Sequence, residues 1–127
     1  MHVEATLLAN VARVDPDGLL YVEGGGWQHY PVLTLPATLD GHLAGIIALD
    51  ESELGQLHLV GFAVSQGGKR LESPGSMIVS SARTVVPFAW RFTTIVHAEG
   101  VIAVELSDDS GEVFGAAECK VVLAAPS

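Results

Sequence analysis

Positive charge is scarce in this sequence. Its 127 residues include six Lys and Arg against fifteen Asp and Glu, which gives a formal net charge of −9. No Lys or Arg lies from Val14 to Gly68, and of the six cations only Lys69 and Arg70 are adjacent. Because polyanions are bound mainly by clustered cations that release counterions, we expect neither nucleic acid nor an anionic membrane as a partner.

Cysteine is nearly absent, and long apolar runs are missing. Cys119 is the sole cysteine, so an intramolecular disulfide and a cysteine-rich metal site are excluded. No apolar stretch reaches the roughly 18 residues that a membrane-spanning helix needs, and Met1 to Glu4 lack the basic segment of a secretory signal. We therefore expect a cytoplasmic protein with a reduced thiol.

Motifs of catalysis and of cofactor binding are also lacking. The sequence has no G-x-S-x-G segment, and Cys119 is predicted to lie on an apolar strand face, where a thiol is usually inert. The triple glycine Gly24-Gly25-Gly26 is not followed by the Lys-Ser or Lys-Thr of a phosphate-binding loop. These absences predict a protein that is not an enzyme and that carries no cofactor.

What the sequence does contain is apolar residues in short segments. They make up 49% of the chain, and Gly or Pro interrupts them about every eight to twelve residues. That spacing is typical of a sandwich or barrel. Since a domain usually has about 100 to 200 residues, we predict one domain over residues 1–127, an all-β fold that forms a single antiparallel β-sandwich of about eight or nine strands.

The opening segment fits two patterns. Apolar residues alternate along residues 3–11 as in a strand, but Leu7, Val11 and Val14 would also line one face of a helix. The tight-turn sequence Asp15-Pro16-Asp17-Gly18 follows directly and favours the strand. We therefore predict a hairpin whose second strand covers Leu19 to Glu23.

Glycine and proline divide the middle of the chain. The triple glycine is expected to end the first hairpin, because three residues without Cβ are unfavourable inside a strand. Pro31 to Gly41 is predicted to be a crossover loop. His42 to Leu49 and Gln56 to Val64 are apolar on both faces and are predicted to be central strands of one hairpin around an acidic loop.

Further turns divide the C-terminal half. Gly67-Gly68 and Pro74-Gly75 are turn signals, and Pro87 is expected to separate a strand over Met77 to Ser81 from one over Phe88 to Thr94. Val101 to Leu106 should form a last hairpin with the terminal strand. The predicted buried face of that strand consists of Ala117, Cys119, Val121 and Leu123.

An aromatic cluster beside the triple glycine is the first candidate site. It contains Trp27, His29 and Tyr30, with Tyr21 nearby. Such a cluster could be a stacking platform that binds a sugar or another flat ligand, or a hydrophobic plug that closes one end of a sandwich. We favour the plug, because aromatic residues most often serve burial.

Acidic loops and histidines are the second set of candidates. Carboxylates from several loops could hold a cation such as Ca²⁺, and the candidate ligands are Asp15, Asp17, Asp108 and Asp109. Asp is also a turn residue for local reasons, and the spacing does not match the twelve-residue calcium loop. The five histidines form no closely spaced pair typical of a metal site. We favour structural roles for both groups.

The stretch from Ala9 to Trp27, ANVARVDPDGLLYVEGGGW, resembles the opening of a family of small bacterial proteins of unknown function that is common in actinobacteria. These begin with a Leu-Ala-Asn strand, a D-G-x-L hairpin and a glycine-rich turn before an aromatic residue. The resemblance covers the first quarter of the chain, and the segment from Ile46 to Val64 is more apolar than in that family. It implies an all-β sandwich and offers no activity or site residue to transfer.

Two functions are therefore predicted. The first is a non-catalytic protein-interaction or assembly module that associates with its own copies, because so many apolar residues in a small domain exceed what its core can cover. The alternative is a small-ligand or carbohydrate-binding domain that uses the aromatic cluster.

Overall fold

The computed structural model describes residues 1–71 and 75–124. These residues form ten strands and one short 3-10 helix, η1 (Glu51–Glu53), and no helix among them has the length and apolar character needed to cross a membrane. The strands are β1 (His2–Val14), β2 (Leu20–Gly25), β3 (His29–Val32), β4 (Ala37–Ala48), β5 (His58–Gln66), β6 (Lys69–Arg70), β7 (Gly75–Val79), β8 (Val85–Val96), β9 (Gly100–Ser107) and β10 (Val113–Leu123).

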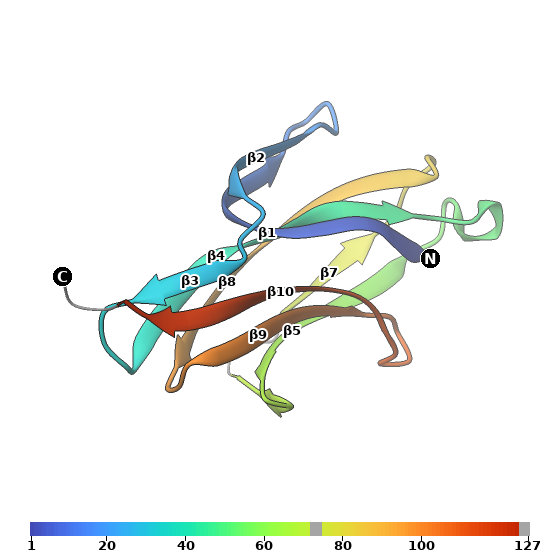
Figure 1. The fold of residues 1–127 in the computed structure, drawn as a ribbon. Helices are drawn as coiled ribbons and strands as arrows, with labels where there is room; N and C mark the ends of the chain where they lie inside the picture. The colour runs from blue at the N-terminus through green and yellow to red at the C-terminus, as the bar shows by residue number, and fades with distance from the viewer. Residues whose placement is uncertain (72–74, 125–127) are drawn as a thin grey trace.

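Two sheets face each other across a shared core (Figure 1). The four-stranded sheet has the order β2-β1-β4-β8, and the six-stranded sheet has the order β3-β10-β9-β5-β6, with β7 also paired to β5. Strands β3 and β10 run parallel, and the other pairs of the described residues are antiparallel. The predicted all-β sandwich is confirmed.

The first hairpin projects from the sandwich, and its outer part, Val11–Gly25, is called the arm below (Figure 1). The strand pattern prevails over the helical one along the whole of β1. Gly18 adopts a φ of 81° in the turn, and its N–H donates a hydrogen bond of 2.9 Å to the carbonyl of Asp15. The predicted hairpin is therefore confirmed.

The triple glycine does not end this hairpin where predicted. Gly24 and Gly25 belong to β2, and Gly25 pairs with Ala9. Glycine is needed at position 24 because φ is 60° there and a Cβ would overlap the side chain of Asn10. The chain leaves the ladder only at Gly26, where φ is 85°.

The predicted crossover loop from Pro31 to Gly41 is wrong apart from residues 33–36. Pro31 lies in β3, and β4 already begins at Ala37. The reason is a partner distant in sequence, since Ala37 pairs with Val96 at the far end of β8. A local pattern of loop residues does not reveal that partner.

The predicted hairpin of two central strands is also wrong. Strand β4 pairs with β1 and β8, whereas β5 pairs with β9, β6 and β7 in the other sheet. The segment that contains η1 carries the chain from one sheet to the other. Each strand contributes one apolar side to the core between the sheets, with Leu43 and Ile47 from β4 and with Val60, Phe62 and Val64 from β5.

The later turns follow the glycine pattern but not the proline pattern. Gly67 and Gly68 have φ values of 59° and 78° and join β5 to β6, as predicted. Pro74 lies outside the described residues. Pro87 lies within β8, opposite Ile46, instead of separating two strands. It is tolerated there because β8 is the edge strand of its sheet, where a missing N–H can face away from the ladder.

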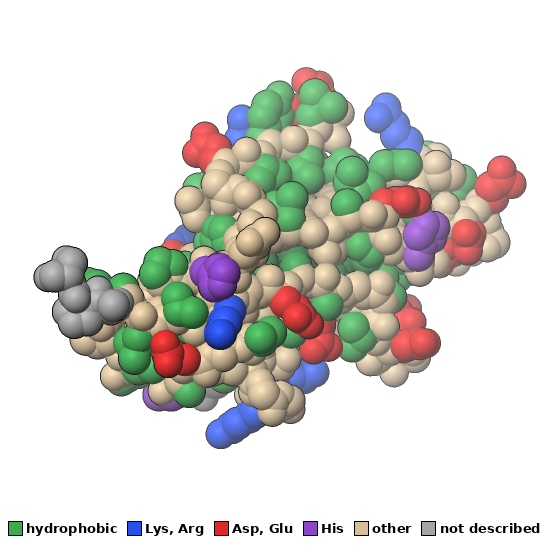
Figure 2. Space-filling view, viewed as in Figure 1, with side chains coloured by type: hydrophobic (Ala, Val, Ile, Leu, Met, Phe, Trp, Pro, Cys, Tyr) green, Lys and Arg blue, Asp and Glu red, His purple; other side chains and the backbone are tan. Residues whose placement is uncertain are grey.

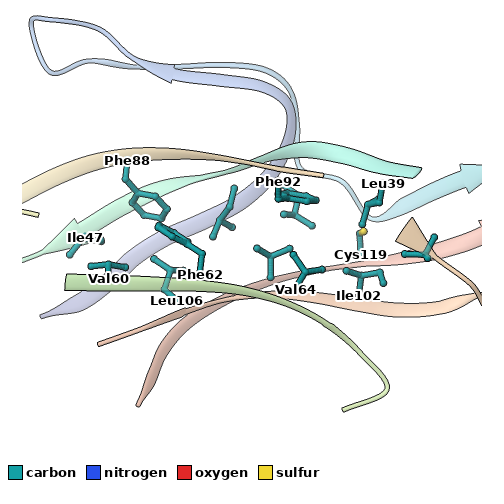
Figure 3. Packing of buried hydrophobic residues seen from close by; sticks show 14 of the residues in the cluster. Leu39, Ile47, Val60, Phe62, Val64, Phe88, Phe92, Ile102, Leu106 and Cys119 are labelled. Carbon is teal, nitrogen blue, oxygen red and sulfur yellow. The ribbon is translucent and has the colours of Figure 1, made fainter. Parts of the chain in front are cut away.

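The core lies between the two sheets and is rich in Phe, Leu, Ile and Val (Figure 3). Phe62 of β5 stacks on Trp90 of β8, with ring centroids 4.6 Å apart. Cys119 and Val121 are buried on the inner side of β10, as predicted, but Leu123 is 45% exposed. Leu123 is the last residue of β10, where the sandwich no longer covers the strand.

Candidate functional site

Trp27 lies at the base of the arm and packs into one end of the sandwich. Its ring centroid is 5.0 Å from that of Tyr30 and 6.4 Å from that of Phe92. Its indole N–H donates a hydrogen bond of 2.9 Å to Oδ1 of Asn10. A Cβ at Gly41 would overlap the ring, so this glycine makes room for Trp27 on β4. These contacts favour the interpretation of Trp27 as a hydrophobic plug.

The other members of the aromatic cluster do not complete a common platform. Tyr30 is half-buried beside Trp27, whereas His29 is exposed on β3. Tyr21 lies on the arm, where the guanidinium carbon of Arg13 is 4.4 Å from its ring centroid. Among the described residues, no ring contact joins Tyr21 to Trp27 or Tyr30. The fold therefore brings two of the four predicted residues together.

The predicted metal-binding carboxylates lie in two different turns. Asp15 and Asp17 are in the turn of the arm, and Asp108 and Asp109 are in the turn between β9 and β10. Within residues 1–71 and 75–124, no group of three His, Cys, Asp or Glu side chains is arranged to hold a metal ion. The geometry therefore favours separate structural roles for these loops.

Asp108 organises its own turn. Its Oδ1 accepts hydrogen bonds from the Ser110 hydroxyl at 2.6 Å and from the N–H groups of Ser110 and Glu112 at 2.9 and 3.0 Å. The Ser110 hydroxyl is the main cause that holds the pKa of Asp108 below its ordinary value. Asp109 accepts a hydrogen bond of 2.9 Å from the N–H of Leu59 and so ties this turn to β5.

Glu53 has a comparable structural role in the loop between β4 and β5. Its Oε1 accepts hydrogen bonds from the ammonium group of Met1 at 2.6 Å and from the N–H of Asp50 at 2.9 Å. The Met1 ammonium is the main cause that lowers the pKa of Glu53. The ring of His58 lies 2.8 Å from the carbonyl oxygen of Glu53. These contacts tie the loop to Met1 and to the start of β5.

Cys119 is not placed as a nucleophile. Its side chain points into the core from β10, opposite Ile102 of β9, and it is only 3% exposed. Burial raises the pKa of the Cys119 thiol to about 11. The thiol therefore stays protonated near neutral pH, in a form that does not act as a nucleophile.

Sequence reasoning missed one surface, the outward side of the four-stranded sheet. Along β4, Ile46 lies between Ala5 of β1 and Pro87 of β8. The preceding residue, Gly45, faces the core beside Phe88, so strand alternation directs Ile46 outward. What we call the outer apolar face consists of the outward residues Ala5, Leu7, Ala44, Ile46, Ala48, Val85, Pro87 and Ala89. Ala44 and Ala48 are themselves buried, and the other six are exposed or half-buried.

The apolar surface continues on the arm. Five of its large apolar side chains are at least 37% exposed, namely Val11, Val14, Leu19, Tyr21 and Val22. Figure 2 shows hydrophobic side chains gathered over the β1–β2 hairpin and the strands beside it. The sequence already contained a signal for this surface, because β4 is apolar at successive positions. That pattern was interpreted as a central strand with both faces covered by other parts of the same chain.

No protein-family model matches the sequence, and no curated protein matches it either. The resemblance of residues 9–27 to an actinobacterial family therefore stays a prediction. The arguments on function below rest on the geometry of the chain itself.

Proposed function

We propose that the protein is a non-catalytic interaction module that associates with a second copy of itself. The outer apolar face together with the arm carries this proposal. Val85 on the face is 51% exposed and Leu19 on the arm is 57% exposed. Exposed apolar area beyond roughly a few hundred Å² usually marks an interface, and a stable dimer buries about 800 Å² from each partner.

The distribution of charge favours contact through this face. Two copies that each carry a formal charge of −9 repel each other over most of their surface. None of the eight residues of the outer apolar face is charged, so two copies can meet there without placing carboxylates against each other. An isologous contact of this kind needs only one self-complementary surface.

The arm also has a suitable counterpart on the opposite border of the face. It carries the three carboxylates Asp15, Asp17 and Glu23 and one cation, Arg13, whereas Arg83 lies just before β8. The start of β1 and the start of β8 lie on either side of Ala48, at the same end of the sheet. Arg83 therefore lies at that end, and the arm lies at the opposite end, where β1 finishes. In the proposed dimer, a twofold axis in the plane of contact and perpendicular to the strands directs the arm of each copy toward Arg83 of the other.

Size-exclusion chromatography with light scattering tests the proposal. At micromolar concentration we expect twice the chain mass of 13.3 kDa, and we expect Leu19→Lys to produce the monomer. The matched control is Leu59→Lys, since Leu59 is 50% exposed and lies on β5 of the other sheet. A monomeric parent protein would refute self-association. Dissociation by Leu59→Lys alone would place the interface on the six-stranded sheet instead.

The proposed setting of this module is the cytoplasm. Support comes from the single cysteine, Cys119, which is unpaired and buried and so suits a reducing compartment. Nucleic acid is not a proposed partner, because only two of the six cations are adjacent in the sequence. The proposed partner is therefore protein.

A further inference from the structure

An open groove runs along one side of the sandwich, where an edge of each sheet is exposed. Its volume is about 890 Å³, and the described residues that line it are Thr38, Lys69, Arg70, Leu71, Thr93, Thr94, Ile95 and His97. Strand β8 ends the four-stranded sheet, and β6 ends the pairing path of the six-stranded sheet. The groove therefore lies between two sheet edges and uses none of the residues of the outer apolar face or the arm.

Strand β8 has backbone groups that its sheet does not use. It pairs with β4 along its whole length, from Val85 opposite Ala48 to Val96 opposite Ala37, and has no second neighbour among the described strands. Alternate residues of such an edge strand direct their N–H and C=O groups away from the ladder. Pro87 removes one donor near the start of β8, whereas the groove segment, residues 93–96, contains no proline.

The groove also gathers positive charge in a chain that has little of it. Lys69 and Arg70 line it side by side, both are exposed, and His97 lines it as well. No Asp or Glu is among its described lining residues. Neither Lys69 nor Arg70 forms an ion pair with any residue that the structure describes. Two cations that pair with no described carboxylate, beside the outer edge of a strand, complement an acidic extended segment.

We propose that this groove binds an extended acidic peptide segment of a partner protein, which adds as a strand to the outer edge of β8, where no described strand pairs. Backbone hydrogen bonds to Thr93 and Ile95, whose N–H and C=O groups point away from β4, hold the segment, and its carboxylates face Lys69 and Arg70. Ile95 is 55% exposed and, with Leu71, offers apolar contact to the side chains between the carboxylates. The expected ligand therefore alternates acidic and aliphatic residues, because successive side chains of a strand point to opposite sides.

Fluorescence anisotropy with a labelled Glu-Val-Glu-Val-Glu-Val peptide and the full chain tests the charge contacts. We expect saturable binding that is weakened about fivefold or more by Lys69→Glu and by Arg70→Glu. Lys120→Glu is the matched control, since Lys120 is an exposed cation on β10 outside the groove. Equal weakening by Lys120→Glu would overturn the proposal, because only net charge would then matter, and so would a lack of saturable binding.

A second measurement tests the addition of a strand. The same peptide with alternate backbone amides methylated keeps its carboxylates but loses donors, and we expect it to bind at least about tenfold more weakly. In ¹⁵N correlation spectra, the unmodified peptide should shift the amide signals of residues 93–97. Equal binding of the methylated peptide would overturn the proposal. Shifts of these signals by inorganic phosphate without any binding of the peptide would also overturn it, in favour of a small-anion site.

Discussion

The two sheets share one core but have different outer faces. On the six-stranded sheet, Glu105 of β9 lies between Ala63 and Ala116, and in a neighbouring row Ala103 lies beside Glu118. On the four-stranded sheet, the corresponding row consists of Ala5, Ile46 and Pro87. One outer face therefore intersperses charge among small residues, and the other has an apolar centre. The difference teaches that a strand apolar on both sides can have one side in the core and the other on the outward side of its sheet.

The largest effect on stability is expected at Trp27, which lies between β2 and β3 and contacts both sheets. Trp27→Ala removes a side chain that contacts Tyr30 of one sheet and Phe92 of the other, and should lower the free energy of unfolding by about 3 to 5 kcal/mol. Denaturant unfolding measures the loss, with His29→Ala at an exposed position as the control. An unchanged unfolding midpoint, combined with lost binding of a sugar ligand, would instead support the carbohydrate-binding alternative.

The contrast between the outer faces is tested by placing the same charge on each. Ile46→Lys puts an ammonium group in the centre of the outer apolar face and should weaken self-association by about 2 kcal/mol or more, which is roughly thirtyfold in the dissociation constant. Ala63→Lys makes the same addition beside Glu105 on the other face and should leave association unchanged. Sedimentation equilibrium measures both constants. Equal effects would show that the two faces do not differ in function.

Two glycines test how closely each sheet is packed. A Cβ at Gly45 of the four-stranded sheet would overlap the carbonyl oxygen of Ala5 and approach the Phe88 ring at 2.9 Å. A Cβ at Gly61 of the six-stranded sheet would meet the hydroxyl of Ser107 at 2.7 Å, and that side chain can rotate away. We expect Gly45→Ala to cost about 1 to 3 kcal/mol and Gly61→Ala less than about 1 kcal/mol. Thermal unfolding of both variants gives the order, and the reverse order would contradict this account of the packing.

The smallest effect is expected at the polar border of the four-stranded sheet. The Arg91 side chain, followed by the Thr93 hydroxyl, holds the pKa of Asp40 below its ordinary value of 3.8. Because the folded-state pKa is the lower one, this contribution to stability is present above pH 3.8 and is lost as the pH falls through the folded-state pKa. Arg91→Gln should raise the pKa of Asp40, which a carboxyl NMR titration measures. An unchanged titration would show that Arg91 is not the cause.

Local chemistry allowed the hairpins to be predicted from the sequence. Asp15 to Gly18 and Gly67-Gly68 each contain the residues that their turns require, so both turns follow from a few adjacent positions. The terminal hairpin was found in the same way, because Asp108 satisfies its own turn. Such signals do not depend on any distant part of the chain.

Pairing between distant strands could not be predicted. The apolar patterns of β4 and β5 indicate burial, but they do not say whether burial comes from an adjacent strand or from the opposite sheet. Pro87 was expected to separate two strands because proline is unfavourable inside a sheet. It lies in an edge strand instead, and that position is known only once the whole sheet is assembled. For the candidate site, the cluster of Trp27 and Tyr30 was found by proximity in sequence. The groove was missed because Lys69 and Ile95 come from different sheets.

The buried position of Cys119 also makes the protein a reporter of its own opening. With a pKa of about 11 and 3% exposure, this thiol should not react with alkylating reagents while β10 is in place. The rate at which a thiol reagent modifies the unaltered chain should therefore report how often β10 separates from the sandwich. Because the chain has no other cysteine, a cysteine introduced on the arm would be labelled selectively, and the arm could then be followed by a probe while the core thiol stays silent.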